Sequence, residues 1–113
     1  MNKQQNALTE AYYYILLSLF KPLHGYGIMK KIATMTNGRI NIAAGTLYGA
    51  LSKLEQYQWI SALPTSSSEQ RKQYIITDKG KDIILAEFKR LKELVKNGHL
   101  IIEGENQNGK ETN

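Results

Sequence analysis

The sequence predicts a mainly α-helical fold with one small β-hairpin, arranged as a winged helix-turn-helix followed by a C-terminal dimerisation helix. Three observations predict it. Apolar residues recur at helical spacing in three segments before residue 59, the pattern alternates as in a strand across residues 59–76, and a helical stripe returns after residue 77. Three helices followed by a hairpin are the element order of a winged helix-turn-helix.

Sequence signals mark the ends of the first two helices. The first is expected over Asn6–Phe20 with Thr9 as a candidate N-cap. Lys21-Pro22 ends it, because the residue before a proline is disfavoured in a helix. The second is expected over Gly25–Thr36, and Asn37-Gly38 then signals a turn.

Short strands are expected on both sides of the third helix. Residues 39–42 alternate between polar and apolar and predict a very short strand. The third helix begins at residue 43 or 44 and runs to 58. Residues 59–65 and 71–76 then form a hairpin around a polar tip. The apolar face of the third helix consists of Leu47, Ala50, Leu51 and Leu54.

The fourth helix is expected to be the longest. Thr77 is its candidate N-cap, it reaches at least Lys96, and an Asn-Gly pair then ends or kinks it. We therefore divide the chain into a winged helix-turn-helix DNA-binding domain over 1–76, a dimerisation helix over 77–102 and a disordered tail over 103–113.

Composition excludes several classes of protein. A chain of 113 residues is one domain of ordinary size, and 42% hydrophobic with 22% charged residues excludes bulk disorder. The absence of cysteine excludes disulfides, thiolate metal sites and thiol nucleophiles. The longest apolar run, residues 11–20, is too short to span a membrane, and no signal-peptide cleavage site follows the N-terminus. We therefore expect a cytoplasmic protein with no membrane partner.

Basic residues concentrate in the first part of the chain. Residues 1–81 hold ten basic and four acidic residues, a net charge of +6, whereas residues 82–113 hold five basic and six acidic residues, a net charge of −1. This division suggests one surface that faces a polyanion, although a merely basic protein would show the same balance.

No pattern of residues indicates catalysis or metal binding. His24 and His99 are far apart and lack a metal-ligand spacing, and the acidic residues are scattered. Gly25-Tyr26-Gly27 follows no expected strand and lacks the third glycine of a dinucleotide fingerprint. We therefore expect no enzyme activity and no cofactor.

The third helix and the hairpin carry the residues expected to contact nucleic acid. Small residues in the first turn of a recognition helix let its backbone approach the major groove, where Thr46 and Tyr48 would meet base edges. Long cationic side chains suit phosphates. An ordinary helix start, packing of Tyr48 on the second helix and a solvated basic edge strand are the alternative explanations. The candidate DNA-binding residues are Ala44, Gly45, Thr46, Tyr48, Lys53, Arg71 and Lys72.

The long C-terminal helix carries an apolar stripe that so small a core cannot easily cover. An exposed stripe of this kind marks an interface, and two-fold pairing is the commonest solution. The alternative is that the stripe folds back onto the first helix of the same chain. The candidate dimer-interface residues are Tyr13, Leu16, Leu17, Ile84, Phe88, Leu91 and Val95.

Several separated motifs follow one another over about residues 8–95. The motifs are Leu8-Thr9-Glu10-Ala11, Tyr14-Ile15-Leu16-Leu17-Ser18-Leu19, His24-Gly25-Tyr26-Gly27-Ile28, Gly45-Thr46-Leu47-Tyr48-Gly49-Ala50-Leu51, Lys53-Leu54-Glu55, Trp59-Ile60, Arg71-Lys72-Gln73-Tyr74 and Ile76-Thr77-Asp78-Lys79-Gly80. Each motif alone is weak, but the ordered set is specific and resembles the PadR family of bacterial transcriptional regulators. The C-terminal region, a single helix that is short beside the multi-helix C-terminal domain of other members, resembles the smaller subfamily.

The resemblance implies a winged-helix dimer that represses transcription by binding an operator, often near its own promoter, and that a small molecule releases in some members. Multidrug-binding members stack flat drugs between tryptophans of the C-terminal helix. Here the one tryptophan is Trp59, and Leu91 takes the corresponding helix position, so drug stacking of that type is not expected. The family's DNA-contacting helix and wing carry over to Thr46, Tyr48, Lys53, Arg71 and Lys72.

Two functions from different classes fit these observations. The first is a homodimeric, sequence-specific regulator of transcription that binds a roughly palindromic operator in double-stranded DNA, represses a local promoter or its own, and responds to a small-molecule inducer. The second is a winged-helix module that binds a protein partner and whose basic face is incidental. A gel-shift titration separates them, because only the first predicts specific DNA binding.

Overall fold

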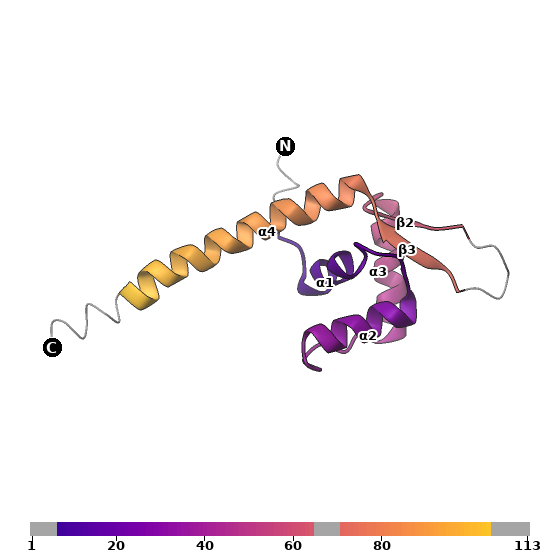
Figure 1. Cartoon of the computed structure of the whole chain (residues 1–113), viewed down its shortest axis with the longest axis horizontal. Coiled ribbons are helices and arrows are strands. Elements are labelled where there is room, and N and C mark those ends of the chain that lie inside the picture. Colours follow the sequence, from indigo (N-terminus) through magenta and orange to yellow (C-terminus); the bar gives the residue numbers. More distant parts are fainter. Residues whose placement is uncertain (1–6, 65–70, 105–113) are drawn as a thin grey trace.

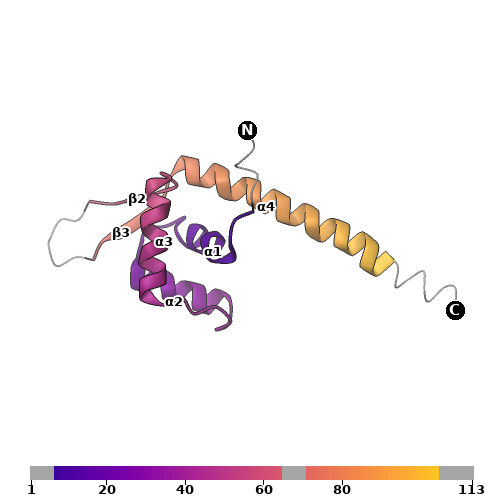
Figure 2. The same cartoon turned by 180° about the vertical axis from the view of Figure 1, so that it is seen from behind.

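The computed structural model describes residues 7–64 and 71–104. Figures 1 and 2 show the short helices packed together with a small sheet beside them, and a long helix that extends away from this body. This arrangement confirms the predicted fold class. The elements are α1 (Glu10–Ser18), β1 (Leu23–His24), α2 (Gly25–Met35), α3 (Ala44–Gln56), β2 (Ile60–Ala62), β3 (Gln73–Ile76), α4 (Asp78–Gly98) and the π-helical turn η2 (His99–Glu103).

One hydrophobic core joins the short helices, the sheet and the first part of α4. The predicted apolar face of α3 is confirmed, because its four residues are at most 9% exposed. Each fully buried aliphatic side chain stabilises the fold by about 1.5–3 kcal/mol. The buried apolar residues are Ile15, Leu16, Leu19, Ile28, Ile32, Leu47, Ala50, Leu51, Leu54, Ile60, Tyr74, Ile76 and Ile84.

The sheet is antiparallel, with β3 between β1 and β2. Leu23 of β1 pairs with Tyr74, and Ile60 of β2 pairs with Ile76. The expected hairpin is therefore present, with Tyr74 and Ile76 buried on one face. The two-residue strand β1, which precedes Gly25, was not expected from the sequence. The expected polar tip lies outside the described residues.

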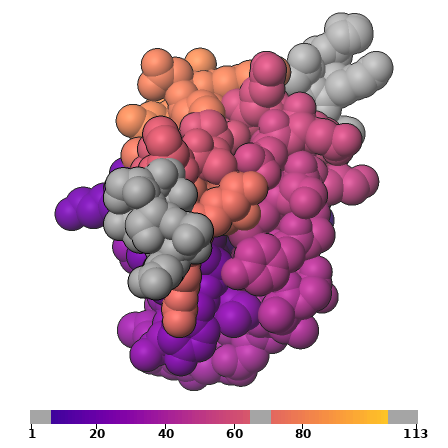
Figure 3. All heavy atoms as spheres, turned by 90° about the vertical axis from the view of Figure 1, so that its right-hand side faces the viewer, coloured from indigo at the N-terminus to yellow at the C-terminus, as the bar shows by residue number. Residues whose placement is uncertain are grey.

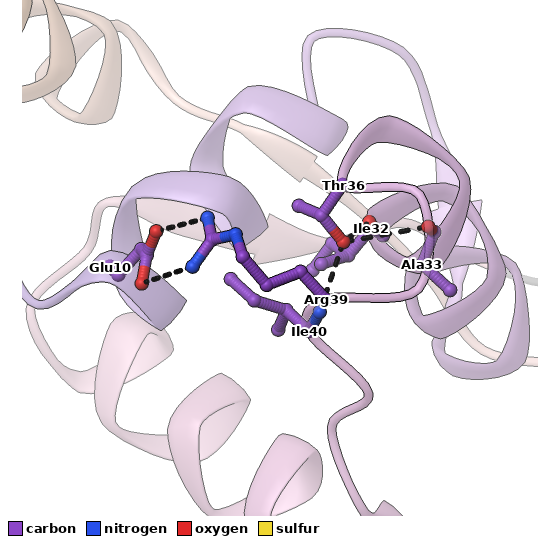
Figure 4. A network of polar contacts seen from close by, with 6 residues as sticks. All are labelled: Glu10, Ile32, Ala33, Thr36, Arg39 and Ile40. Atoms are coloured by element: carbon purple, nitrogen blue, oxygen red, sulfur yellow. Dashed lines mark hydrogen bonds and ion pairs between the residues drawn. The ribbon is translucent and has the colours of Figure 1, made fainter.

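The predicted strand over residues 39–42 is wrong, because side-chain hydrogen bonds hold this segment as a loop (Figure 4). The Thr36 hydroxyl donates to the Ile32 carbonyl at 2.9 Å and accepts from the Ile40 N–H at 3.1 Å. The Arg39 guanidinium donates to both carboxylate oxygens of Glu10, at 2.5 and 3.4 Å. The turn predicted at Asn37-Gly38 is confirmed, and both residues have positive φ angles.

A compact junction ties the end of α3 to the start of α4. The Thr77 hydroxyl donates to the Gln58 carbonyl at 2.7 Å and accepts from the Gly80 N–H at 3.0 Å, so Thr77 is the predicted N-cap. The Thr77 N–H donates to the Trp59 carbonyl at 2.9 Å. A Cβ on residue 80 would collide with that same carbonyl oxygen, which requires a glycine there.

The ends of three helices differ from the sequence expectations. The third helix, expected to run to residue 58, ends at Gln56. Thr9 caps α1 as predicted, but the helix begins at Glu10 and ends at Ser18, before the Lys21-Pro22 stop signal. The Asn-Gly pair does not interrupt α4, which continues through Gly98 into η2. Glu103, the first residue of the expected disordered tail, is still helical, and the tail beyond residue 104 lies outside the described residues.

Candidate nucleic-acid interface

The first two turns of α3 present small and polar residues at the surface. Ala44, Gly45 and Thr46 are all exposed, whereas Leu47 is fully buried. Ala43 precedes the helix as its N-cap and makes no side-chain capping hydrogen bond. A helix start without bulky side chains lets another molecule approach the backbone closely, as a recognition helix requires.

Tyr48 is both exposed and packed on α2. The residue is 49% exposed, and its hydroxyl lies where a Cβ on residue 25 would stand. Gly25 is therefore required at the start of α2 to leave room for Tyr48. The two explanations of Tyr48 that the sequence left open, surface contact and packing, are compatible in the structure.

The hairpin of β2 and β3, with Arg71 and Lys72 directly before β3, is the wing of this fold. It supplies two exposed cations next to tyrosines. The Arg71 guanidinium lies 5.9 Å from the ring centroid of Tyr26, and the Lys72 ammonium lies 5.6 Å from that of Tyr74. Such cation–π contacts contribute about 0.5–1 kcal/mol each at exposed sites. Both cations line one cleft with Tyr48 of α3, and Figure 3 shows the segment around β3, in orange, on the same face as α3, in magenta.

One cleft brings three of the candidate DNA-binding residues together. Tyr48, Arg71 and Lys72 line it jointly, and Lys53, in the last turn of α3, does not. Lys53 follows Thr46 by seven residues, two helical turns, so both lie on the same exposed side of α3, about 10 Å apart along the axis. Sequence reasoning missed the three other residues of the cleft, His24, Tyr26 and Tyr74, although all three lie in motifs that it quoted.

Of the candidate dimer-interface residues, two are buried and five are at least partly exposed. Leu16 and Ile84 are 0% and 2% exposed in the core of their own chain, so their side chains are not available to a partner. Leu17 is partly buried. The remaining four, which are Tyr13, Phe88, Leu91 and Val95, line an apolar groove of about 480 Å³. Lys92, Lys96 and His99 complete the lining of this groove.

A buried carboxylate lies on α4 near this groove. Glu87 is 6% exposed and accepts hydrogen bonds from Arg90 at 2.6 and 2.8 Å and from the Leu8 N–H at 3.3 Å. The hydrogen bonds from Arg90 lower the pKa of Glu87, outweighing the opposing effect of burial. Burial, and then the charge of Glu87, raise the pKa of the Tyr13 phenol.

Two negative findings apply to residues 7–64 and 71–104. No group of three or more histidine, aspartate or glutamate side chains there is placed to hold a metal ion. No helix there is long and apolar enough to cross a membrane.

Comparison with known proteins identifies relatives of this fold. The sequence pattern of the "Transcriptional regulator PadR-like family" matches residues 15–86. A PadR-like transcriptional regulator from Bacillus cereus has a TM-score of 0.70 at 20% identity, over 81% of this chain and 90% of that chain. A PadR family transcription regulator from Clostridium difficile has a TM-score of 0.64 at 27% identity, over 80% and 98%. Comparison with curated proteins gave no significant match.

One similar structure includes nucleic acid. Bacillus subtilis PadR, solved in complex with operator DNA, has a TM-score of 0.58 at 27% identity, over 66% of this chain and 44% of that chain. The family pattern begins in α1 and ends in α4, and so covers all the elements that form the winged helix-turn-helix body. This chain therefore belongs to the PadR-like family of transcriptional regulators.

Proposed function

We propose that the protein is a cytoplasmic transcriptional repressor that binds a roughly palindromic operator as a homodimer. The observation that carries the proposal is the shared face of α3 and the wing, where Tyr48 meets Arg71 and Lys72 in one cleft. The operator complex of Bacillus subtilis PadR, 27% identical, supports DNA as the partner.

The contacts divide into base-reading and phosphate-binding groups. Thr46 and Tyr48 lie near the start of α3, where a recognition helix reaches base edges in the major groove. Lys53, Arg71 and Lys72 are exposed cations and suit the backbone, which positions the protein without reading sequence. The operator would then have about 10 bp between the centres of its half-sites.

The homodimer would form through the groove on α4. Phe88 and Val95 are 46% and 71% exposed on a helix that extends away from the body. A second copy would cover this stripe, and Tyr13 of α1 would border the contact. A small-molecule inducer would bind at the same seam, because ligand sites favour such interfaces.

A salt titration of DNA binding tests the function. The parent protein is titrated onto a duplex of the DNA upstream of its own gene and onto a duplex of scrambled sequence. We expect tighter binding to the first, and log K for both to fall linearly with log salt concentration because counterions are released. Equal binding to both duplexes at every salt concentration would reject sequence-specific regulation and favour the protein-interaction module.

A further inference from the structure

A cleft of about 450 Å³ lies between the start of α2, α3 and the start of β3. Figure 3 shows the face on which these three segments adjoin. Every side chain that lines the cleft carries an N–H or O–H donor, two of them are cationic, and no acidic side chain of the described residues is among them. The lining residues are His24, Tyr26, Tyr48, Arg71, Lys72 and Tyr74.

The orientation of His24 is set by its capping role. Its Nδ1 accepts a hydrogen bond from the Gly27 N–H at 3.0 Å and so caps the N-terminus of α2. A ring nitrogen that accepts a hydrogen bond carries no proton, which places the proton of a neutral imidazole on Nε2. The imidazole is therefore a fixed hydrogen-bond donor in the lining of the cleft.

Two cations, one from α2 and one from the wing, lie beside the ring of Tyr26 at the cleft. The Lys30 ammonium and the Arg71 guanidinium lie 5.6 and 5.9 Å from the centroid of its ring. A guanidinium beside an aromatic ring uses none of its N–H groups as a donor to an oxygen there, so these groups can bind an anion. Tyr26 thus joins the wing cation to α2.

Tyr48 connects α3 to the same place. Its hydroxyl lies against Gly25, directly beside His24 and Tyr26 in the chain. The donors of α2, α3 and the wing therefore converge on one space, although they come from positions 24 to 74 of the sequence.

We infer that this cleft binds one phosphodiester group of the DNA backbone, with His24 and Tyr26 as further DNA-contacting residues. The inference rests on the proposed function. The non-bridging oxygens of a phosphate only accept hydrogen bonds, and a lining made of donors with two cations matches them. A phosphate held by α2, α3 and the wing together would fix the register of α3 in the groove.

A free phosphate or nucleotide presents the same chemistry to these donors. DNA is favoured because Tyr48 and Arg71 also belong to the recognition helix and the wing, so a bound backbone would pass through the cleft on its way between them. A small anion would need only part of this lining.

The test uses substitutions that remove a donor and keep its structural role. His24→Asn retains an oxygen that can cap α2 and removes the donor from the position of the imidazole Nε2, because the amide N–H groups of asparagine lie on a shorter side chain. Tyr26→Phe keeps the ring and removes the hydroxyl. Each should weaken binding to operator and scrambled duplexes about tenfold alike, since hydrogen bonds to charged groups are of this strength. The salt slope should not change, because neutral donors release no counterions. Arg71→Ala should lower the slope by about one per chain.

Tyr57→Phe is the matched control, because Tyr57 is 41% exposed at the end of α3 and does not line the cleft. If the parent binds DNA and both donor variants bind like this control, the phosphate site is rejected while the proposed function stands. If the parent binds no DNA, the phosphate site and the proposed function are both rejected. In a further measurement, inorganic phosphate is titrated while the NMR shifts of the His24 ring are followed. If these shifts change and reach a plateau, and both variants bind DNA like the parent, the cleft binds a free anion and the inference is overturned. Melting temperatures of the variants separate lost contacts from lost folding.

Discussion

The hydroxyl of Tyr48 lies against the Cα of Gly25, in the space that any larger residue would fill with its Cβ. This contact joins the recognition helix to the first turn of α2, and it brings a half-exposed tyrosine to the surface in a fixed orientation. The absence of a side chain at position 25 therefore determines the orientation of Tyr48 on the surface of α3, although residue 25 itself is buried.

Gly25→Ala should displace Tyr48 and destabilise the protein by about 1–3 kcal/mol, the usual cost of overpacking. Urea unfolding measures the change. Gly49→Ala is the matched control, because a Cβ there meets nothing within 4 Å, and alanine in a helix should raise stability by about 0.5–1 kcal/mol. Equal stability of parent and Gly25→Ala would show that Tyr48 moves aside without cost.

Thr46→Ala and Lys53→Ala should have different effects on DNA binding. Thr46→Ala should cost about 1–3 kcal/mol on the operator and much less on scrambled DNA, because it removes a contact to a base. Lys53→Ala should weaken binding to all sequences alike and lower the salt slope by about one unit per chain. Anisotropy titrations at several salt concentrations measure both effects. A sequence-independent loss for Thr46→Ala would remove it from the base-reading group.

Val95→Glu should convert the proposed dimer into a monomer. Val95 is 71% exposed in the single chain, so the charge should leave the fold intact, yet a second copy would bury it in an apolar contact at a cost of several kcal/mol. Asn97→Glu places the same charge two residues away on the polar side of α4, and it should remain dimeric. Sedimentation equilibrium distinguishes these outcomes. A parent that sediments as a monomer at high micromolar concentration would rule out the dimer.

Stability should fall as the pH drops below the ordinary glutamate pKa of 4.5. Arg90 lowers the pKa of Glu87 in the folded state, so the unfolded chain takes up the proton first. The contribution of this group is therefore complete above 4.5 and is lost as the pH falls through the folded value. Glu87→Gln should be destabilised by about 1–3 kcal/mol at pH 7 and lose part of this pH dependence. Urea unfolding at pH 3–7 measures both, and parallel pH profiles for parent and variant would contradict the assignment.

The sequence predicted the helices and the hairpin because their signals are local. Thr9 and Thr77 were identified as caps, and both accept the expected backbone hydrogen bonds. The strand β1 was missed because two residues have no periodicity, and its pairing with β3 joins positions about fifty residues apart. The loop at 39–42 alternates like a strand, but its hydrogen bonds go to Thr36 and Glu10, which no local pattern reveals.

The candidate site was only partly predictable for the same reason. Periodicity placed Leu16 and Val95 on apolar stripes, yet one is fully buried and the other is 71% exposed. Helical spacing gives the direction of a side chain and not what covers it. The donor role of His24 also depends on a hydrogen bond to Gly27 that follows from the three-dimensional start of α2.

The attachment of α4 to the body has a mechanical consequence. Only the first part of α4 is held, because Ile84 lies in the core and the Leu8 N–H donates to Glu87. Residues 88–98 extend beyond this attachment for about 16 Å at 1.5 Å per residue, so they form a lever arm fixed at one end. A bend of about 12° beyond Glu87 would move the far end by about 3 Å over that length. That displacement is close to the rise of one base pair, about 3.4 Å. In the proposed dimer, a small bend where α4 leaves the body would therefore be amplified into a change of about one base-pair step in the distance between the two recognition helices.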